Sequence, residues 1–222
     1  MSRSKPLAVY LEVGRRRTFA AVADWPGWCR SGKGDDDALE VLASYAPRYA
    51  VVAEEAGVRF PRSAADAFDV VERLPGSAST DFGAPGAIAM GDREPLTAAA
   101  AKRQAALVAA SWSVLDRVAA GAPARLRKGP RGGGRDRDAV VAHVLEAEAS
   151  YARKLGLRFR PPTPGDKKAI AEAREAILGV LRRTSSGEPP VEKGWPPRYA
   201  ARRIAWHVLD HAWEIEDKSE PS

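Results

Sequence analysis

The stretch RIAWHVLDHAWEIED, from Arg203 to Asp217, carries the strongest structural and chemical signal in the chain. Its apolar residues recur with the spacing of one strongly amphipathic helix. His207 and His211 lie four residues apart, so on a helix both rings point to the same side, about 5–6 Å apart at Cβ. The remaining histidine, His143, falls within a second predicted helix, DAVVAHVLEAEASYARKL. Two predicted helices hold every histidine of the protein, and this pattern predicts a three-histidine metal site.

The region from residue 96 to residue 222 predicts four helices separated by loops rich in Gly, Pro and Arg. The stretch from Leu96 to Gly121 predicts a helix whose N-cap is Thr97 or Asp92. Asp136 or Asp138 is the expected N-cap of the helix that holds His143. The third helix, KKAIAEAREAILGVLRR, is capped by Asp166, and the last one begins at Pro196 and Pro197. Four helices in one run fit a four-helix bundle.

The first region, residues 1–74, predicts a small ββαβ module. LAVYLEV and TFAAVAD are expected to form a hairpin, WPGWCRSGKG a loop, and AFDVVERL a third strand. The helix between them starts at three aspartates, which suit a helix N-terminus, and Pro47 predicts a break into two segments. Residues 75–95 are rich in Gly, Pro, Ser and Ala and predict a linker or irregular segment. The fold class is therefore expected to be α+β.

Composition narrows the classes of function. The chain has 222 residues, a net charge of +6 and one cysteine, Cys29, which excludes an internal disulfide. No apolar run approaches the roughly 18–20 residues that span a bilayer. The N-terminus turns polar too soon for a signal peptide, so a cytosolic location is expected. Much of the surplus of positive charge lies in the loop from Arg125 to Arg137. No aromatic residues interleave with it, so a solvated connection is favoured over nucleic-acid binding.

The histidine helices resemble a known superfamily. His143 within A-H-V-L-E-A-E, and His207 and His211 within W-H-V-L-D-H-A-W-E, are similar to the DinB/YfiT superfamily, which includes mycothiol-dependent maleylpyruvate isomerase-type domains. The resemblance covers Leu96 to Asp217. It implies a four-helix bundle that holds a divalent ion, usually zinc or nickel. It also implies a thiol-dependent transferase or hydrolase acting on a small-molecule substrate, with a low-molecular-weight thiol as a further cofactor, and a homodimer.

A second, shorter resemblance concerns the N-terminal module. Asp24, Pro26, Gly27, Cys29, Ser31 and Gly32, followed by a helix from Asp35, resemble the HicB antitoxin-type fold. That family often binds a protein partner. No ribbon-helix-helix or helix-turn-helix segment accompanies the module here, so the resemblance implies an appended domain that engages a protein partner.

Two acids lie near the histidines on the predicted helices. Glu214 projects within about 40° of the mean direction of His207 and His211, and Glu146 about 60° from His143. Either acid is expected to accept an imidazole N–H or to act as the proton acceptor in catalysis. Val208 stands where an H-E-x-x-H metalloprotease has its glutamate, so that mechanism is excluded.

Three functions remain open from the sequence, and the third is nucleic-acid binding through the basic loop, which predicts an affinity that falls steeply with salt. The first is a metal-dependent transferase or hydrolase, in which the ion holds a thiolate or a hydroxide. Cys29 lies outside the helical region and is expected to be a loop residue rather than the nucleophile. The second is a non-catalytic binding or regulatory protein, in which the N-terminal module engages a partner and the bundle is structural.

Overall fold

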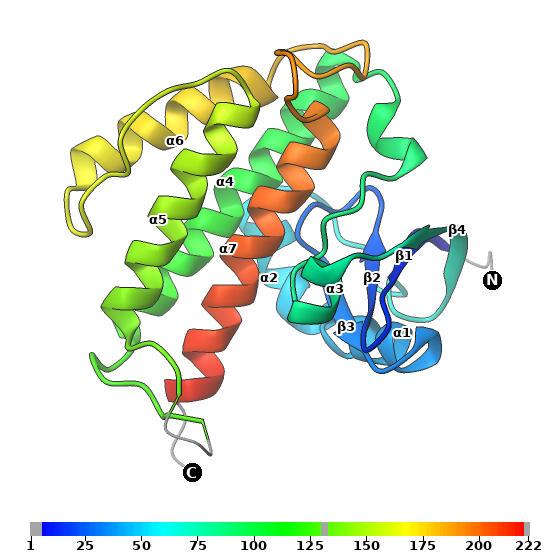
Figure 1. Ribbon diagram of the computed structural model, residues 1–222, viewed down its shortest axis with the longest axis horizontal. Helices are drawn as coiled ribbons and strands as arrows, with labels where there is room; N and C mark the ends of the chain where they lie inside the picture. The colour runs from blue at the N-terminus through cyan, green and yellow to red at the C-terminus, as the bar shows by residue number, and fades with distance from the viewer. Residues whose placement is uncertain (1–5, 130–132, 220–222) are drawn as a thin grey trace.

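The computed structural model describes residues 6–129 and 133–219, in which a mixed sheet is followed by helices (Figure 1). Four strands form the sheet: β1 (Leu7–Val13), β2 (Thr18–Val22), β3 (Cys29–Gly32) and β4 (Phe68–Pro75). Their order is β3-β2-β1-β4, with β1 antiparallel to β2, β2 antiparallel to β3, and β1 parallel to β4. The expected α+β class is confirmed.

The expected ββαβ order is wrong by one strand. Residues 29–32, expected to belong to a loop, form β3 and pair with β2 from Thr18↔Gly32 to Ala21↔Cys29. The predicted hairpin of β1 and β2 and the predicted helix break are both confirmed. Helix α1 (Asp35–Ser44) and helix α2 (Ala46–Glu55) meet at Tyr45, and Pro47 lies in the first turn of α2, where its missing N–H costs no hydrogen bond.

Residues 75–95 are more ordered than a linker. They contain the short helix α3 (Ala78–Phe82) and the 3-10 turn η1 (Met90–Arg93). Asp92 forms a buried, bidentate ion pair with Arg202. The carboxylate of Glu12, which is buried in β1, accepts hydrogen bonds from the backbone of Gly86 and Ala87. The segment is thus held between the sheet and the last helix, as Figure 1 shows beside α7.

Four longer helices follow: α4 (Ala98–Gly121), α5 (Arg137–Lys154), α6 (Lys167–Leu181) and α7 (Pro197–Ser219). The predicted caps at Thr97 and Asp166 are confirmed, since each side chain accepts a backbone N–H of the first turn. The predicted side-chain cap of α5 is wrong. Asp136 precedes the helix, but its carboxylate accepts from the backbone of Leu126 and from Lys128 instead.

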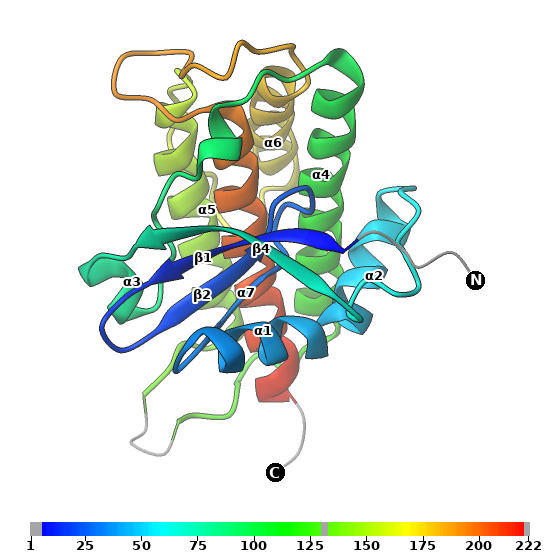
Figure 2. The ribbon, with the colours of Figure 1, turned by 90° about the vertical axis from the view of Figure 1, so that its right-hand side faces the viewer.

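The last helix is the centre of the molecule. Figure 2 shows the sheet crossing in front of α7, with α4, α5 and α6 behind it. One sheet face turns Tyr10, Phe19 and Cys29 toward Trp206 of α7, and the ring of Phe19 meets Trp206 edge-on at 6.0 Å. The other face packs on α1, and α2 packs on α4.

One buried apolar cluster includes residues of the sheet, of α1 and α2, and of the long helices. The N-terminal part and the helical part therefore share a core, whose burial is the main favourable term in folding. The domain boundary within residues 75–95 stays a prediction. None of the helices in residues 6–129 and 133–219 has the length and apolar character that crossing a bilayer requires.

Candidate metal centre

The three histidines meet between α5 and α7. His143 projects from α5 toward His207 and His211, which lie one turn apart on α7. Their ring centres are separated by 5.1 Å, 5.0 Å and 4.6 Å for the pairs 143–207, 143–211 and 207–211. One nitrogen from each ring lies within 4.8 Å of the other two. The prediction that these side chains come close enough to hold a metal ion is confirmed.

The closest nitrogens have the separation that a shared ion requires. Nε2 of His143 and Nε2 of His207 are 3.3 Å apart. Two nitrogens bound tetrahedrally to one zinc ion at about 2.0–2.1 Å would lie about 3.3–3.4 Å apart. A proton on one of these nitrogens fits the same distance as a hydrogen bond, so the separation is compatible with an ion without requiring one.

The protonation of the rings favours coordination. Burial lowers the pKa of His207 well below its ordinary value and also lowers the pKa of His143, and the neighbouring imidazoles add to both shifts. These two rings are therefore neutral near pH 7 and carry the lone pairs that a metal ion needs.

Glu214 holds His211 in the orientation that coordination requires. Nδ1 of His211 lies 2.7 Å from a carboxylate oxygen of Glu214, one turn further along α7. The hydrogen bond from His211, together with Lys218, lowers the pKa of Glu214 to about 2, so the carboxylate is ionised and can only accept. This hydrogen bond uses Nδ1 of His211 and leaves Nε2 as its nitrogen for a metal ion. Glu214 thus lies where an acceptor that orients a ligating histidine is expected.

Nδ1 of His207 gives a further test of the fit. This nitrogen is buried and has no hydrogen-bond partner among the described residues. Buried polar atoms are seldom left unpaired. With an ion at Nε2, the proton of His207 would lie on Nδ1 and would still lack an acceptor among these residues, so the fit rests on the three converging nitrogens and not on this atom. The donor set therefore fits a divalent ion that accepts nitrogen ligands.

Glu146 stands differently from Glu214. It is exposed on α5, and its negative charge raises the pKa of His143, against the larger effects of burial and of His211. Its predicted role as proton acceptor stays a prediction.

Three side chains near the site were not anticipated from the sequence. Lys218 pairs with Glu214, Tyr151 meets the ring of His207 edge-on at 5.6 Å, and the guanidinium of Arg203 lies over Trp206 and Tyr151. A helical projection from His207 and Glu214 would have found Arg203 and Lys218, each four residues from its neighbour. Tyr151 depends on how α5 meets α7, which the sequence alone does not give.

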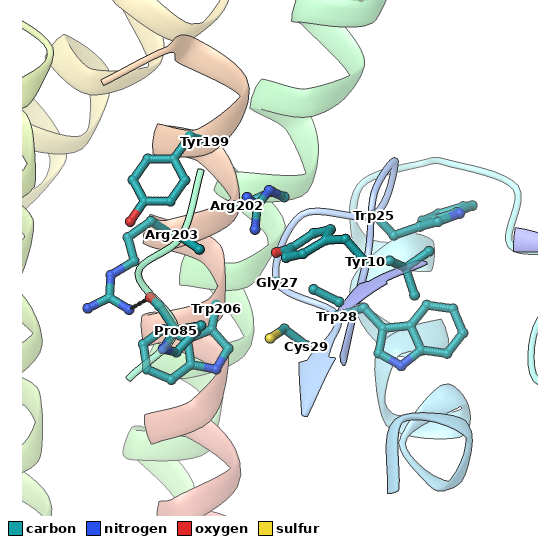
Figure 3. Close-up of a pocket in the computed structure, with 13 residues that line it drawn as sticks. Tyr10, Trp25, Gly27, Trp28, Cys29, Pro85, Tyr199, Arg202, Arg203 and Trp206 are labelled. Atoms are coloured by element: carbon teal, nitrogen blue, oxygen red, sulfur yellow. Dashed lines mark hydrogen bonds between the residues drawn. The ribbon is translucent and has the colours of Figure 1, made fainter. Parts of the chain in front are cut away.

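Cys29 lies on the sheet side of α7, against Trp206, as Figure 3 shows. The predicted loop residue is part of β3, and its side chain is buried. Burial raises the pKa of the thiol far above neutrality, so it is protonated and a poor nucleophile.

The basic loop meets the C-terminal end of α7. The backbone of Arg127 donates to the carbonyl of Lys218, and its guanidinium donates to the carbonyl of Asp217. The central residues of this loop, 130–132, lie outside the described residues.

Comparison of the chain with models of protein families, with curated proteins and with solved structures found no match in any of the three. The two resemblances therefore rest on the quoted residues alone.

Proposed function

We propose that the protein is a metal-dependent enzyme with a DinB-like four-helix bundle, a thiol-dependent transferase or a hydrolase that acts on a small molecule. The observation that carries the proposal is the convergence of the chain's three histidines from two helices on one point. Zinc or nickel suits such a set, because imidazole is a preferred ligand of both ions. Three protein ligands leave room for a water molecule or a thiol. The four long helices and their order support the bundle.

The side chains have separate roles in this proposal. When bound, the ion would supply Lewis acidity and hold a thiolate or a hydroxide near neutral pH. His143, His207 and His211 hold the ion as neutral ligands. Glu214 keeps the proton of His211 on Nδ1 and preserves the ring's orientation. Glu146, at the exposed edge of α5, is available to accept a proton. The nucleophile comes from solvent or from a low-molecular-weight thiol, because Cys29 is buried on another face of α7.

Elemental analysis of the untagged protein tests this function. We expect about one equivalent of zinc or nickel per chain, which is lost in His211→Ala. Cys29→Ser is the matched control, since it removes the chain's only thiol and should leave the metal content unchanged. A protein that takes up no metal even after incubation with zinc and with nickel would contradict the proposal.

The alternative is a binding or regulatory protein. His207 is only 7% exposed, and a closed site of this kind favours that alternative. In that case the HicB-like module would engage a protein partner and the bundle would be structural. The protein loaded with cobalt(II) separates the two functions. A change in its visible absorption spectrum on adding 2-mercaptoethanol indicates an open position, and an unchanged spectrum favours the alternative. A cytosolic location and a homodimer remain part of the proposal.

A further inference from the structure

Arg203 lies one turn before His207 and His211 on the same side of α7. It precedes His207 by four residues, as His207 precedes His211, so the three side chains share one side of the helix. Its guanidinium lies 4.7 Å from the ring centre of Trp206 and 5.5 Å from that of Tyr151. The ring of Tyr151 in turn meets His207 at 5.6 Å. A permanent positive charge therefore lies one aromatic ring away from the candidate metal ligands.

The position of this guanidinium is fixed by the segment that joins the sheet to the helices. One of its N–H groups donates to the carbonyl oxygen of Pro85 (Figure 3). The next residues are held firmly: Glu12 accepts from Gly86 and Ala87 at 2.9 Å each, and the hydroxyl of Tyr199 donates to the carbonyl of Gly86 at 3.0 Å. Arg203 is thus oriented before any ligand arrives, which lowers the entropic cost of binding.

Arg203 has N–H groups that remain available to a ligand. A guanidinium carries five N–H donors, and the Pro85 carbonyl is the one acceptor of its hydrogen bonds found in the described part of the chain. Its side chain is half-buried, so a ligand can reach it in surroundings less polar than water. Arginine with free N–H groups in such a place suits a carboxylate, which accepts two parallel hydrogen bonds.

The charged groups near the histidines also favour a negatively charged ligand. The guanidinium of Arg203 lies over Tyr151, whose ring meets His207, and the exposed Arg135 precedes the helix that carries His143. The nearest acid, Glu214, is already engaged by His211 and Lys218. A bound divalent ion would add two further positive charges. The site as a whole therefore favours an anionic ligand.

We propose that Arg203 is the specificity-determining residue of the histidine site and binds a carboxylate of the ligand whose donor atom reaches the metal ion. This inference rests on the proposed function. The ligand class is a small molecule with a metal-binding atom at one end, a carboxylate at the other, and a short apolar body between them that packs on Tyr151. The joining segment of residues 84–87 shapes this end of the site, so the sheet contributes to ligand selection through Glu12.

Two probes of the same shape test the inference. The protein loaded with cobalt(II) is titrated with 3-mercaptopropionate and with 3-mercaptopropionamide, and the visible absorption spectrum reports thiolate binding. The probes share a thiol and differ in one negative charge. We expect the wild-type protein to bind the carboxylate about tenfold more tightly than the amide, the size of one charge-assisted hydrogen bond. Arg203→Met should abolish this preference and leave cobalt stoichiometry unchanged.

Two further variants separate binding from structure and from general charge. Arg203→Lys keeps the charge without the planar pair of donors, so it should show an intermediate preference. Arg135→Gln removes an equal but exposed charge and should change the preference less than about threefold. If Arg203→Met does not fold, Arg203→Lys still decides, because a diffuse field would leave its preference at the wild-type level.

Each outcome has one meaning. Equal affinity for the two probes in the wild-type protein overturns the inference and leaves the metal-dependent function standing. An equal loss of preference in Arg135→Gln and Arg203→Met also overturns it, because a diffuse field would then be the cause. Failure to bind cobalt, zinc or nickel overturns both the proposed function and the inference that depends on it.

Discussion

Glu214 is the residue whose hydrogen bond prepares His211 for a metal ion, and its replacement should weaken metal binding. In Glu214→Gln the side-chain oxygen can still accept from Nδ1, but the negative charge that supports the imidazole is lost. We expect zinc affinity to fall about tenfold, at the lower end for loss of a group that orients a ligating histidine. Competition against a chelator of known affinity measures the change.

Glu146→Gln is the matched control for that variant. It removes the same charge from the exposed surface of α5, and its effect on zinc affinity should be less than about threefold. If the two substitutions weaken zinc binding equally, then Glu214 has no special role and the site is tuned by overall charge alone.

The residues of the site differ in how far sequence could reveal them. His207, His211 and Glu214 follow from helical spacing, because residues three and four apart share a side of the helix whatever surrounds it. His143 followed from the small number of histidines together with the resemblance, since spacing within one helix says nothing of which other helix it faces. Tyr151 and the acceptor of Arg203, the carbonyl of Pro85, are set by packing between segments far apart in the chain.

At the scale of elements, β3, which the sequence did not predict, is short and is stabilised by residues far away in the chain. β3 has four residues, Cys29–Gly32, of which two are Ser and Gly, so it lacks the β-branched and aromatic pattern of a strand. It forms because it pairs with β2 and because Arg30 reaches Asp210 of α7 at 2.9 Å. In the same way, the order in residues 84–87 depends on Glu12, more than 70 positions earlier.

The packing of α4, α5 and α6 includes a buried acid that makes stability depend on pH. Nε1 of Trp112 donates to Glu148 at 2.6 Å, and Arg174 lies 3.7 Å away. Burial outweighs both and raises the pKa of Glu148 from 4.5 to about 7. Between these two values the folded chain binds more protons at Glu148 than the unfolded chain does. This residue's contribution to the free energy of unfolding therefore falls as pH rises, and it levels off above about pH 7.

Glu148→Gln should remove this dependence. Relative to the variant, we expect the wild-type protein to lose roughly 2–3 kcal/mol of stability between pH 5 and pH 8. Urea unfolding of both proteins at the two pH values measures it, and the difference between them cancels the other titrating groups. A difference that stays constant with pH would mean that Glu148 titrates normally.

For the whole molecule, the shared core predicts that the sheet and the helices unfold together. Gly27 provides the test, because it lies in the loop between β2 and β3 where the N-terminal part meets α7. Its φ is +92°, and a Cβ there would lie 2.7 Å from Cδ1 of Leu209 and 3.0 Å from Cβ of Ala205. Gly27→Ala should therefore destabilise the chain by about 2–4 kcal/mol through backbone strain and overpacking.

The result that distinguishes one cooperative unit from two is whether the helices lose stability together with the N-terminal part. If the two parts form one cooperative unit, Gly27→Ala shifts the loss of helical circular dichroism, which comes mostly from α4 to α7, together with the tryptophan fluorescence change. Gly34→Ala is the control, because a Cβ at Gly34 meets nothing within 4 Å and its φ is extended. Gly34 is the N-cap of α1, where alanine is less favourable, so both signals should shift by no more than about 1 kcal/mol. Helices that keep their wild-type midpoint while the fluorescence of Trp25 and Trp28, the two tryptophans of the N-terminal part, changes earlier would show two independent units and would place the domain boundary within residues 75–95. Coincident shifts would mean that the N-terminal sheet stabilises the helix that carries His207 and His211, and through it the candidate metal centre.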